Sequence, residues 1–157
     1  MRQFFCLRAS TIERSGLESL LANASVAIPI VDQERYDAVH AADLVWTASG
    51  TATLEVALLG RPMIVIYRMS PLTYWLGRLL VRVKHVAMAN LLAGERLVPE
   101  LLQDDVNPAR LVSETRTLLD DRTLRCAIAD KLSKLRERLG TPGAAERVAD
   151  IALSMMA

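Results

Sequence analysis

The sequence predicts an α/β fold, in which a parallel β-sheet is flanked by helices and followed by a helical C-terminal part. Short apolar segments alternate with helical patterns from the start of the chain to Tyr67. Such alternation is typical of parallel sheets with crossover helices. From residue 107 onward the periodic segments have helical spacing. We therefore expect half of a doubly wound domain with a helical C-terminus.

Two strand–helix pairs are expected at the start of the chain. Residues 3–9 predict a strand, and Thr11 begins a helical stretch. Residues 26–31 predict a second strand, interrupted by Pro29, and residues 34–42 predict a short helix. This helix leads into the segment around which the fold is organised.

Residues 43–67 predict a strand, a tight turn, a helix and a second strand. An apolar run with a β-branched residue and a tryptophan ends in the four small residues 48–51, as a buried strand does when it enters a tight turn. A mostly buried helix then begins at Thr51, and Gly60 stands where a left-handed helix end is expected. Residues 63–67 predict the second buried strand.

The turn of this unit is the predicted ligand site. Strands joined through a helix are nearly always parallel, so the turn lies at the carboxyl edge of the sheet, where ligands bind. The first amides of a helix lack intrahelical partners and carry partial positive charge, so they can bind a phosphate. Hydroxyls add donors, and a carboxylate one turn further on is suited to a ribose. The predicted residues are Ser49, Gly50, Thr51, Ala52, Thr53 and Glu55.

A purely structural interpretation fits the same residues. Ser49 can be no more than an N-cap, and Glu55 no more than an acid that the helix dipole favours. Small-residue turns open many helices, so local physics leaves both interpretations open. A corner plugged by other side chains, or Glu55 turned inward against a basic residue, would contradict a ligand site.

Composition restricts the classes of partner and compartment. The chain has 157 residues, one domain's worth, and 52% of them are hydrophobic. Its 19 Lys and Arg against 18 Asp and Glu give no reason to expect a nucleic-acid partner. Cys6 and Cys126 form no metal or redox pattern, and we expect two buried, reduced thiols.

Neither a leader nor a membrane-spanning segment is expected. The apolar part of residues 1–10 is too short for a signal peptide, and no apolar run approaches about twenty residues. A cytoplasmic location is the default expectation. His40 and His85 have no carboxylate or second histidine at metal-ligand spacing, and we interpret both as structural.

Residues 68–84 combine aromatic and aliphatic side chains with basic ones and contain no acid. A basic helix of this kind can lie on an anionic bilayer, with its aromatic rings at the level of the headgroups. The residues predicted for this surface are Trp75, Arg78 and Arg82; the two arginines are four apart and share a face. The alternative is core packing with a solvated basic edge.

Residues 83–88 predict a further strand, and residues 90–94 the turn that follows it. Asn90 therefore falls at the carboxyl end of a strand, where it can face a ligand or act as a turn residue. Glu100 and Gln103 are placed on a short helix after Pro99, where they bind a ligand or hold the loop.

The rest of the chain predicts three helices. Asn107 and Pro108 open the first, which runs to residue 119. The second covers residues 122–139 and carries one narrow apolar stripe: Leu124, Ile128, Leu132 and Leu135. The third covers residues 144–156, with these residues expected to face inward: Ala145, Val148, Ala149, Ala152 and Leu153.

Six sequence blocks occur in the order and spacing of one enzyme family. They are Ser-Gly-Thr-Ala-Thr-Leu-Glu at 49–55, Gly-Arg-Pro-Met at 60–63, Tyr-Arg at 67–68, Ser-Pro-Leu-Thr at 70–73, Asn-Leu-Leu-Ala-Gly at 90–94 and Pro-Glu-Leu-Leu-Gln at 99–103. In these blocks the chain resembles the lipid-A-disaccharide synthases. The resemblance covers nearly the whole chain, and the chain covers about the last two-fifths of the family's length.

The resemblance implies the second, nucleotide-sugar-binding lobe of a glycosyltransferase B fold, a Rossmann-like lobe of which residues 107–157 are the helical C-terminal part. It also implies that the N-terminal acceptor lobe, with the proposed catalytic base, and the lobe's first strand and Gly-Ser-Arg turn are absent from this sequence. We therefore expect one incomplete lobe, to which no catalytic residue is assigned.

The activity implied by the resemblance is inverting transfer of 2,3-diacylglucosamine from UDP to a lipid-linked 2,3-diacylglucosamine 1-phosphate, with UDP released. Asn90 and Gln103 join the donor site on the same ground. No cofactor or metal is expected, because the helix end supplies the positive field. The expected partners are the UDP-sugar lipid donor, the lipid acceptor, the inner face of the inner membrane, and a separate N-terminal half or a second copy. The alternatives are another UDP-sugar enzyme and a non-catalytic nucleotide-binding remnant.

Overall fold

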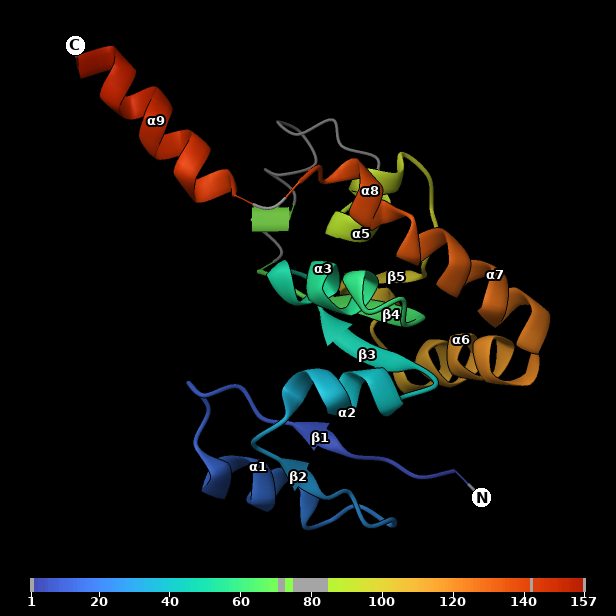
Figure 1. Ribbon diagram of the computed structural model, residues 1–157. Helices are drawn as coiled ribbons and strands as arrows, with labels where there is room; N and C mark the ends of the chain where they lie inside the picture. Colours follow the sequence, from blue (N-terminus) through green and yellow to red (C-terminus); the bar gives the residue numbers. More distant parts are fainter. Residues whose placement is uncertain (1, 71–72, 75–84, 142, 157) are drawn as a thin grey trace.

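The computed structural model describes every residue except 1, 71–72, 75–84, 142 and 157 (Figure 1). Within these described residues the strands are parallel and lie in two sheets, the first of which has two strands and the second three. The first sheet pairs β1 (Cys6–Leu7) with β2 (Ile30–Val31), and the second has the order β3 (Val45–Ala48), β4 (Met63–Tyr67) and β5 (Glu100–Leu102). The α/β prediction is confirmed, although we expected one continuous sheet.

The central unit has the predicted order of strand, turn, helix and strand. Between β3 and β4 lies α3 (Thr51–Leu58), which packs against both strands. The two strands pair in parallel, from Val45 opposite Met63 to Ala48 opposite Ile66. Gly60 adopts the left-handed conformation with φ of 65°, as expected just beyond a helix end.

The helix predicted after Pro99 is wrong, because Glu100 begins β5. The Val65 N–H donates to the Pro99 carbonyl at 2.9 Å, and β5 pairs in parallel with β4. Leu101 is fully buried between the layers. Pairing with a distant strand therefore overrides the helical preference of the local sequence.

The strand predicted for residues 83–88 is also wrong over the part that the structure describes. Residues 85–87 are irregular, and α5 (Met88–Ala93) begins where the strand was expected to end. The predicted turn at residues 90–94 is mostly this helix, which ends at Gly94 with a left-handed φ of 73°. Residues 83–84 lie outside the described residues.

Local signals placed the other helices well. Their bounds are α1 (Arg14–Leu21), α2 (Arg35–Ala41), α6 (Pro108–Asp120), α7 (Arg122–Ser133) and α8 (Leu135–Arg138), with the 3₁₀ turn η1 (Gln103–Asp105) after β5. Asn107 caps α6 as predicted, since its side chain accepts from the Arg110 N–H at 3.0 Å. The single helix expected over residues 122–139 is interrupted at Lys134.

The core lies between the three-stranded sheet and the helices that cover it. Helix α3 contacts α5, α7 and α8, while α6 packs against β4 and α7. Met63, Ile64 and Val65 of β4 are fully buried. The predicted stripe of α7 and α8 largely faces this core, because Ile128, Leu132 and Leu135 are buried, whereas Leu124 is exposed.

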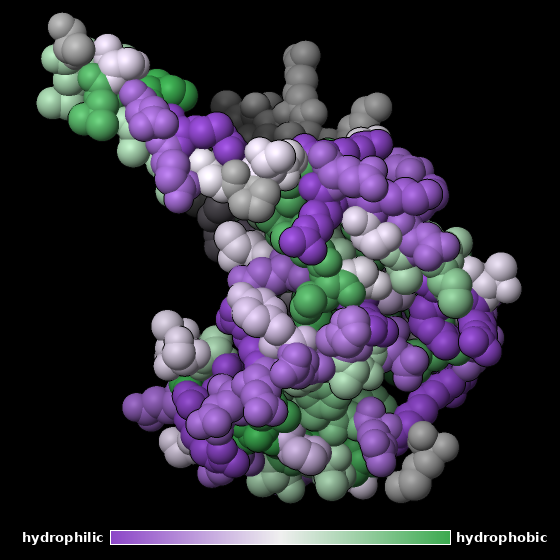
Figure 2. Space-filling model, viewed as in Figure 1, coloured by the Kyte–Doolittle hydropathy of each residue, from purple (hydrophilic) through white to green (hydrophobic). Residues whose placement is uncertain are grey.

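The last helix, α9 (Ala144–Met156), extends away from the rest of the molecule (Figure 1). The prediction that one face of it points inward is wrong, because α9 has no buried residue, and Val148 and Leu153 are 65% and 66% exposed. Figure 2 shows the hydrophobic residues of this helix on its surface.

Two smaller findings concern the thiols and the membrane. Cys126 is exposed and Cys6 is half-buried, so the expectation of two buried thiols is wrong. Across the described ranges, no helix combines the length and the apolar character needed to cross a bilayer.

Candidate functional site

The turn between β3 and α3 lies at the carboxyl edge of the three-stranded sheet. Gly50 is the N-cap residue of α3 and has φ of 150° and ψ of −163°. This backbone region is essentially restricted to glycine. A Cβ added at Gly50 would meet no atom within 4 Å, so the conformation and not a lack of space requires glycine.

Gly50→Ala is expected to lower the free energy of unfolding by about 1–3 kcal/mol through backbone strain alone. Gly16→Ala is the matched control, because Gly16 lies in α1 with equally open surroundings and no left-handed φ. That change should stabilise the protein by roughly 0.5–1 kcal/mol. Urea denaturation of both variants checks the contrast, and equal effects would contradict the assigned conformation of Gly50.

The first amides of α3 face solvent. Gly50, Thr51 and Ala52 are exposed, and their backbone N–H groups donate to no group in the described part of the chain. The Thr53 N–H, in contrast, donates to the Gly50 carbonyl at 3.1 Å. Three adjacent donors at the positive end of a helix dipole therefore remain open to an anion.

Two of the three hydroxyl groups of the turn donate hydrogen bonds to backbone carbonyls, and the third does not. Ser49 Oγ donates to the Val86 carbonyl at 3.2 Å, and buried Thr53 Oγ1 donates to the Gly50 carbonyl at 2.7 Å. Thr51 is exposed and has no such bond. The structure contains no side-chain cap on α3, so Ser49 is not its N-cap. Of the three predicted hydroxyl donors, Thr51 alone is left for a ligand.

Glu55 forms an ion pair with a basic residue, but at the surface. Its carboxylate lies 3.0 Å from Arg35 Nη2 of α2, and the two side chains are 39% and 51% exposed. The hydrogen bond that Arg35 donates to Tyr36, together with the negative charge of Glu55, raises the pKa of Arg35. Glu55 is therefore turned outward and keeps acceptor capacity beyond this pair. An exposed pair of this kind contributes little to stability.

Asn90 is fully buried, and protein groups use its whole hydrogen-bonding capacity. Nδ2 donates to the Val98 carbonyl at 2.9 Å and to Glu100 Oε1 at 2.8 Å. Oδ1 accepts from the N–H groups of Leu97 and Val98 at 2.8 and 3.0 Å. In this arrangement Asn90 has no group left for a nucleotide, and it fixes the loop that leads into β5.

Glu100, for which the sequence left open a ligand-binding or a loop-holding role, bonds to protein groups. Its carboxylate accepts from the N–H groups of Val86 and Ala87 at 3.0 Å, as well as from Asn90. These bonds occupy the start of α5 with a carboxylate, so no anion can bind at that helix end. Because the Val86 carbonyl accepts from Ser49, Glu100 also supports the turn before α3. Only the distant pairing of β5 with β4 brings it there.

Gln103 also bonds to protein backbone. Its Oε1 accepts from the Met69 N–H at 2.8 Å, and its Nε2 donates to the Met69 carbonyl at 3.0 Å. Gln103 itself has a left-handed φ of 51°. These two hydrogen bonds hold the segment after β4 beside the end of β5. The structure thus gives Gln103 the loop-holding role that the sequence left open.

The remaining predicted residues lie elsewhere or outside the described ranges. Trp75, Arg78 and Arg82 are not among the described residues. In the part that is described, no three His, Cys, Asp or Glu side chains come together as a metal ligand set. Two cavities of about 370 and 600 Å³ are lined by residues other than those of the predicted turn.

Comparisons with known proteins agree on one family. The family model described as lipid-A-disaccharide synthetase matches residues 5–153. Similar curated proteins named lipid-A-disaccharide synthase come from Geobacter sulfurreducens, 42% identical over 154 residues, and Syntrophus aciditrophicus, 43% identical over 155 residues. Another from Nitrosococcus oceani is 37% identical over 154 residues.

These alignments include 98% of this chain and 40% of the length of each of the three relatives. The chain therefore spans about two-fifths of the curated relatives it matches.

Proposed function

Because the chain belongs to the lipid-A-disaccharide synthase family, we propose that it supplies the UDP-donor site for the synthesis of the lipid A disaccharide. The reaction is inverting transfer of 2,3-diacylglucosamine from UDP to a lipid-linked 2,3-diacylglucosamine 1-phosphate in lipid A biosynthesis. The relatives are named lipid-A-disaccharide synthase, and the chain aligns with about two-fifths of their length. The open end of α3 lies in the aligned part of this chain.

The observation that carries the proposal is the group of three open amides at Gly50, Thr51 and Ala52. As the glycosidic bond breaks, negative charge develops on the leaving diphosphate. Amides already fixed in place stabilise this charge without having to reorganise, and removing one such donor typically costs an enzyme about a hundred-fold in rate. The Thr51 hydroxyl adds a fourth donor beside them.

Each remaining site residue has a distinct part in the proposal. Glu55 accepts hydrogen bonds from the ribose hydroxyls with the acceptor capacity that its pair with Arg35 leaves. Ser49 and Thr53 shape the turn, and Asn90 and Gln103 act as positioning residues for the loops around it. No residue of this sequence is assigned as the general base that activates the acceptor hydroxyl.

The proposed location of the protein in the cell follows from the chemistry of both substrates. Donor and acceptor carry acyl chains, so we place the chain at the cytoplasmic face of the inner membrane of a Gram-negative bacterium, as a peripheral protein. Trp75, Arg78 and Arg82 stay the predicted contacts with the bilayer. The other wall of the donor cleft comes from an N-terminal lobe or from a second copy.

Glu55→Ala should weaken UDP binding by about 1.5–3 kcal/mol, the usual contribution of charge-assisted hydrogen bonds. Arg35→Ala is the control, because it removes the partner of Glu55 without removing the carboxylate. Calorimetric titration with UDP checks both variants. Unchanged affinity in Glu55→Ala, with the fold intact, would remove Glu55 from the site.

The proposal as a whole is tested by assaying this chain with the UDP-sugar donor and the lipid acceptor, alone and with a separately supplied N-terminal lobe of a relative. We expect UDP binding by the chain alone and disaccharide formation in the presence of the added lobe. UDP binding without turnover in either case would favour the non-catalytic alternative. No UDP binding at all would overturn the proposal.

A further inference from the structure

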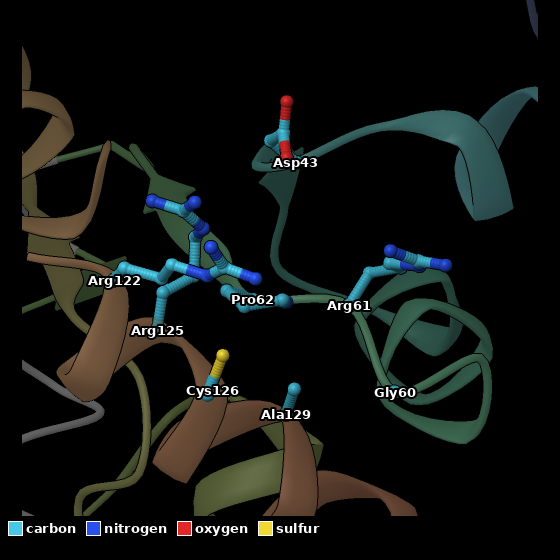
Figure 3. Close-up of a pocket in the computed structure, with 8 residues that line it drawn as sticks. All are labelled: Asp43, Gly60, Arg61, Pro62, Arg122, Arg125, Cys126 and Ala129. Atoms are coloured by element: carbon cyan, nitrogen blue, oxygen red, sulfur yellow. The ribbon is translucent and has the colours of Figure 1, made fainter. Parts of the chain in front are cut away.

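A cavity of about 370 Å³ lies at the amino edge of the three-stranded sheet, on the side away from the proposed donor site. Asp43 before β3, the loop before β4 and one face of α7 form its walls (Figure 3). Three of its lining residues are arginines, Arg61, Arg122 and Arg125. Its volume falls within the range of small-molecule sites.

Two of the arginines converge in this cavity. Figure 3 shows the guanidinium groups of Arg122 and Arg125 close together above Pro62. Arg125 is held in place, because its Nη1 donates to the carbonyls of Leu118 and Leu119 at 3.0 and 2.7 Å. Arg122 forms no ion pair within the described part of the chain. One guanidinium is thus preorganised and the other is available.

The charges of the residues that line the cavity do not balance. Asp43 is the one acid among the lining residues, and it pairs with none of the three arginines. Arg122 is also the first residue of α7, at the positive end of a helix dipole, where a cation is unfavourable. Real proteins break such local preferences at functional sites, so this arrangement singles out the cavity as a candidate. The Nε of Arg61 is, in addition, buried without a hydrogen-bond partner among the described residues.

We propose that this cavity is a second anion site, which binds a phosphate group between Arg122 and Arg125. Planar guanidinium groups bind phosphate oxygens through two parallel hydrogen bonds, and two of them side by side match a phosphate monoester or diphosphate. A bound phosphate offsets the repulsion between the two cations and the unfavourable end of α7. The phosphate belongs either to a soluble ligand or to a lipid headgroup.

Cys126 provides a direct reporter, because it lines the same cavity and is exposed. In a Cys6→Ser background it is the single thiol of the chain. The experiment measures its rate of reaction with N-ethylmaleimide, a neutral reagent, against the concentration of inorganic pyrophosphate, with potassium chloride matching the ionic strength. We expect pyrophosphate to slow the reaction saturably and chloride to leave it unchanged.

Arg122→Gln should raise the half-saturating pyrophosphate concentration about ten-fold, because it removes a charged donor. Arg116→Gln, on the exposed surface of α6, is the matched control and should change nothing. Thr51→Asp, in the proposed donor site, should also leave this protection unchanged, which separates the two sites. An absence of protection, or protection that survives Arg122→Gln, would overturn the proposal.

A second arm identifies the source of the phosphate. Vesicles containing phosphatidylglycerol are compared with vesicles of phosphatidylcholine in the same labelling assay. Protection by pyrophosphate alone supports a soluble phosphate ligand. Further protection by the anionic vesicles, lost in Arg122→Gln, supports a lipid headgroup in the same cavity.

Discussion

Thr51→Asp is expected to lower the affinity for UDP by about 4 kcal/mol, the repulsion between two unit charges at 4 Å near a protein surface. Thr51 is exposed at the first position of α3, beside the three open amides. The same substitution places an acid in the first turn of a helix, which should stabilise the fold by roughly 0.3–1 kcal/mol. Calorimetric titration and thermal unfolding measure the two opposite effects.

This prediction separates the phosphate site from a purely structural turn. If the turn serves only to begin a helix, Thr51→Asp should raise the stability of the fold and leave the affinity for UDP unchanged. Ala109→Asp is the matched control, because Ala109 is exposed in the first turn of α6. Ala109→Asp should stabilise the fold without changing the affinity for UDP. Equal UDP affinity in both variants would contradict a diphosphate at the end of α3.

Asn90→Ala is expected to lower the free energy of unfolding by about 3 kcal/mol or more. Asn90 is fully buried and forms four hydrogen bonds, three of them to backbone groups of Leu97 and Val98. Each buried group left without a partner costs roughly 1–3 kcal/mol. The substitution also removes a donor to Glu100, whose carboxylate stays partly buried beside α5.

Urea denaturation measures this effect. The dependence of the free energy of unfolding on urea concentration is compared between Asn90→Ala and the unchanged protein, because equal slopes show that only the stability has changed. Asn23→Ala is the control, since Asn23 is exposed after α1 and forms no side-chain hydrogen bond within the described residues. It should change the stability by less than about 0.5 kcal/mol. A similarly small change in Asn90→Ala would show that the Asn90 hydrogen bonds do not hold the loop before β5.

The parts of the fold that depend on local chemistry could be predicted from the sequence. The unit from β3 to β4, the left-handed Gly60 and the cap at Asn107 all rest on residues next to one another in the chain. The open end of α3 belongs to this group. Its position at the sheet edge follows from the parallel pairing that a strand–helix–strand unit imposes.

The parts that depend on distant contacts could not be predicted. Strand β5 exists because β4 offers a free edge to it, and nothing within residues 99–103 reveals this pairing. The role of Glu100 at the start of α5 follows from the same pairing. For α9, the periodicity of the sequence predicted a buried apolar face, but that face is exposed in the structure.

The resemblance and the structure complement one another at Asn90 and Gln103. The sequence blocks marked both residues for the donor site, whereas the contacts show both bonded to backbone of neighbouring loops. Residues that hold the loops of a site need not touch the ligand, because the position of the loops itself depends on them. The pair Glu55 and Arg35 could not be read from the sequence, since α2 and α3 are separate elements.

Amide chemical shifts of the isotopically labelled chain during a UDP titration test the central claim most directly. The account predicts the largest saturable changes at the N–H groups of Gly50, Thr51 and Ala52, with smaller ones around Glu55. Changes confined to the arginine cavity at Arg122 and Arg125, or none at the start of α3, would contradict it.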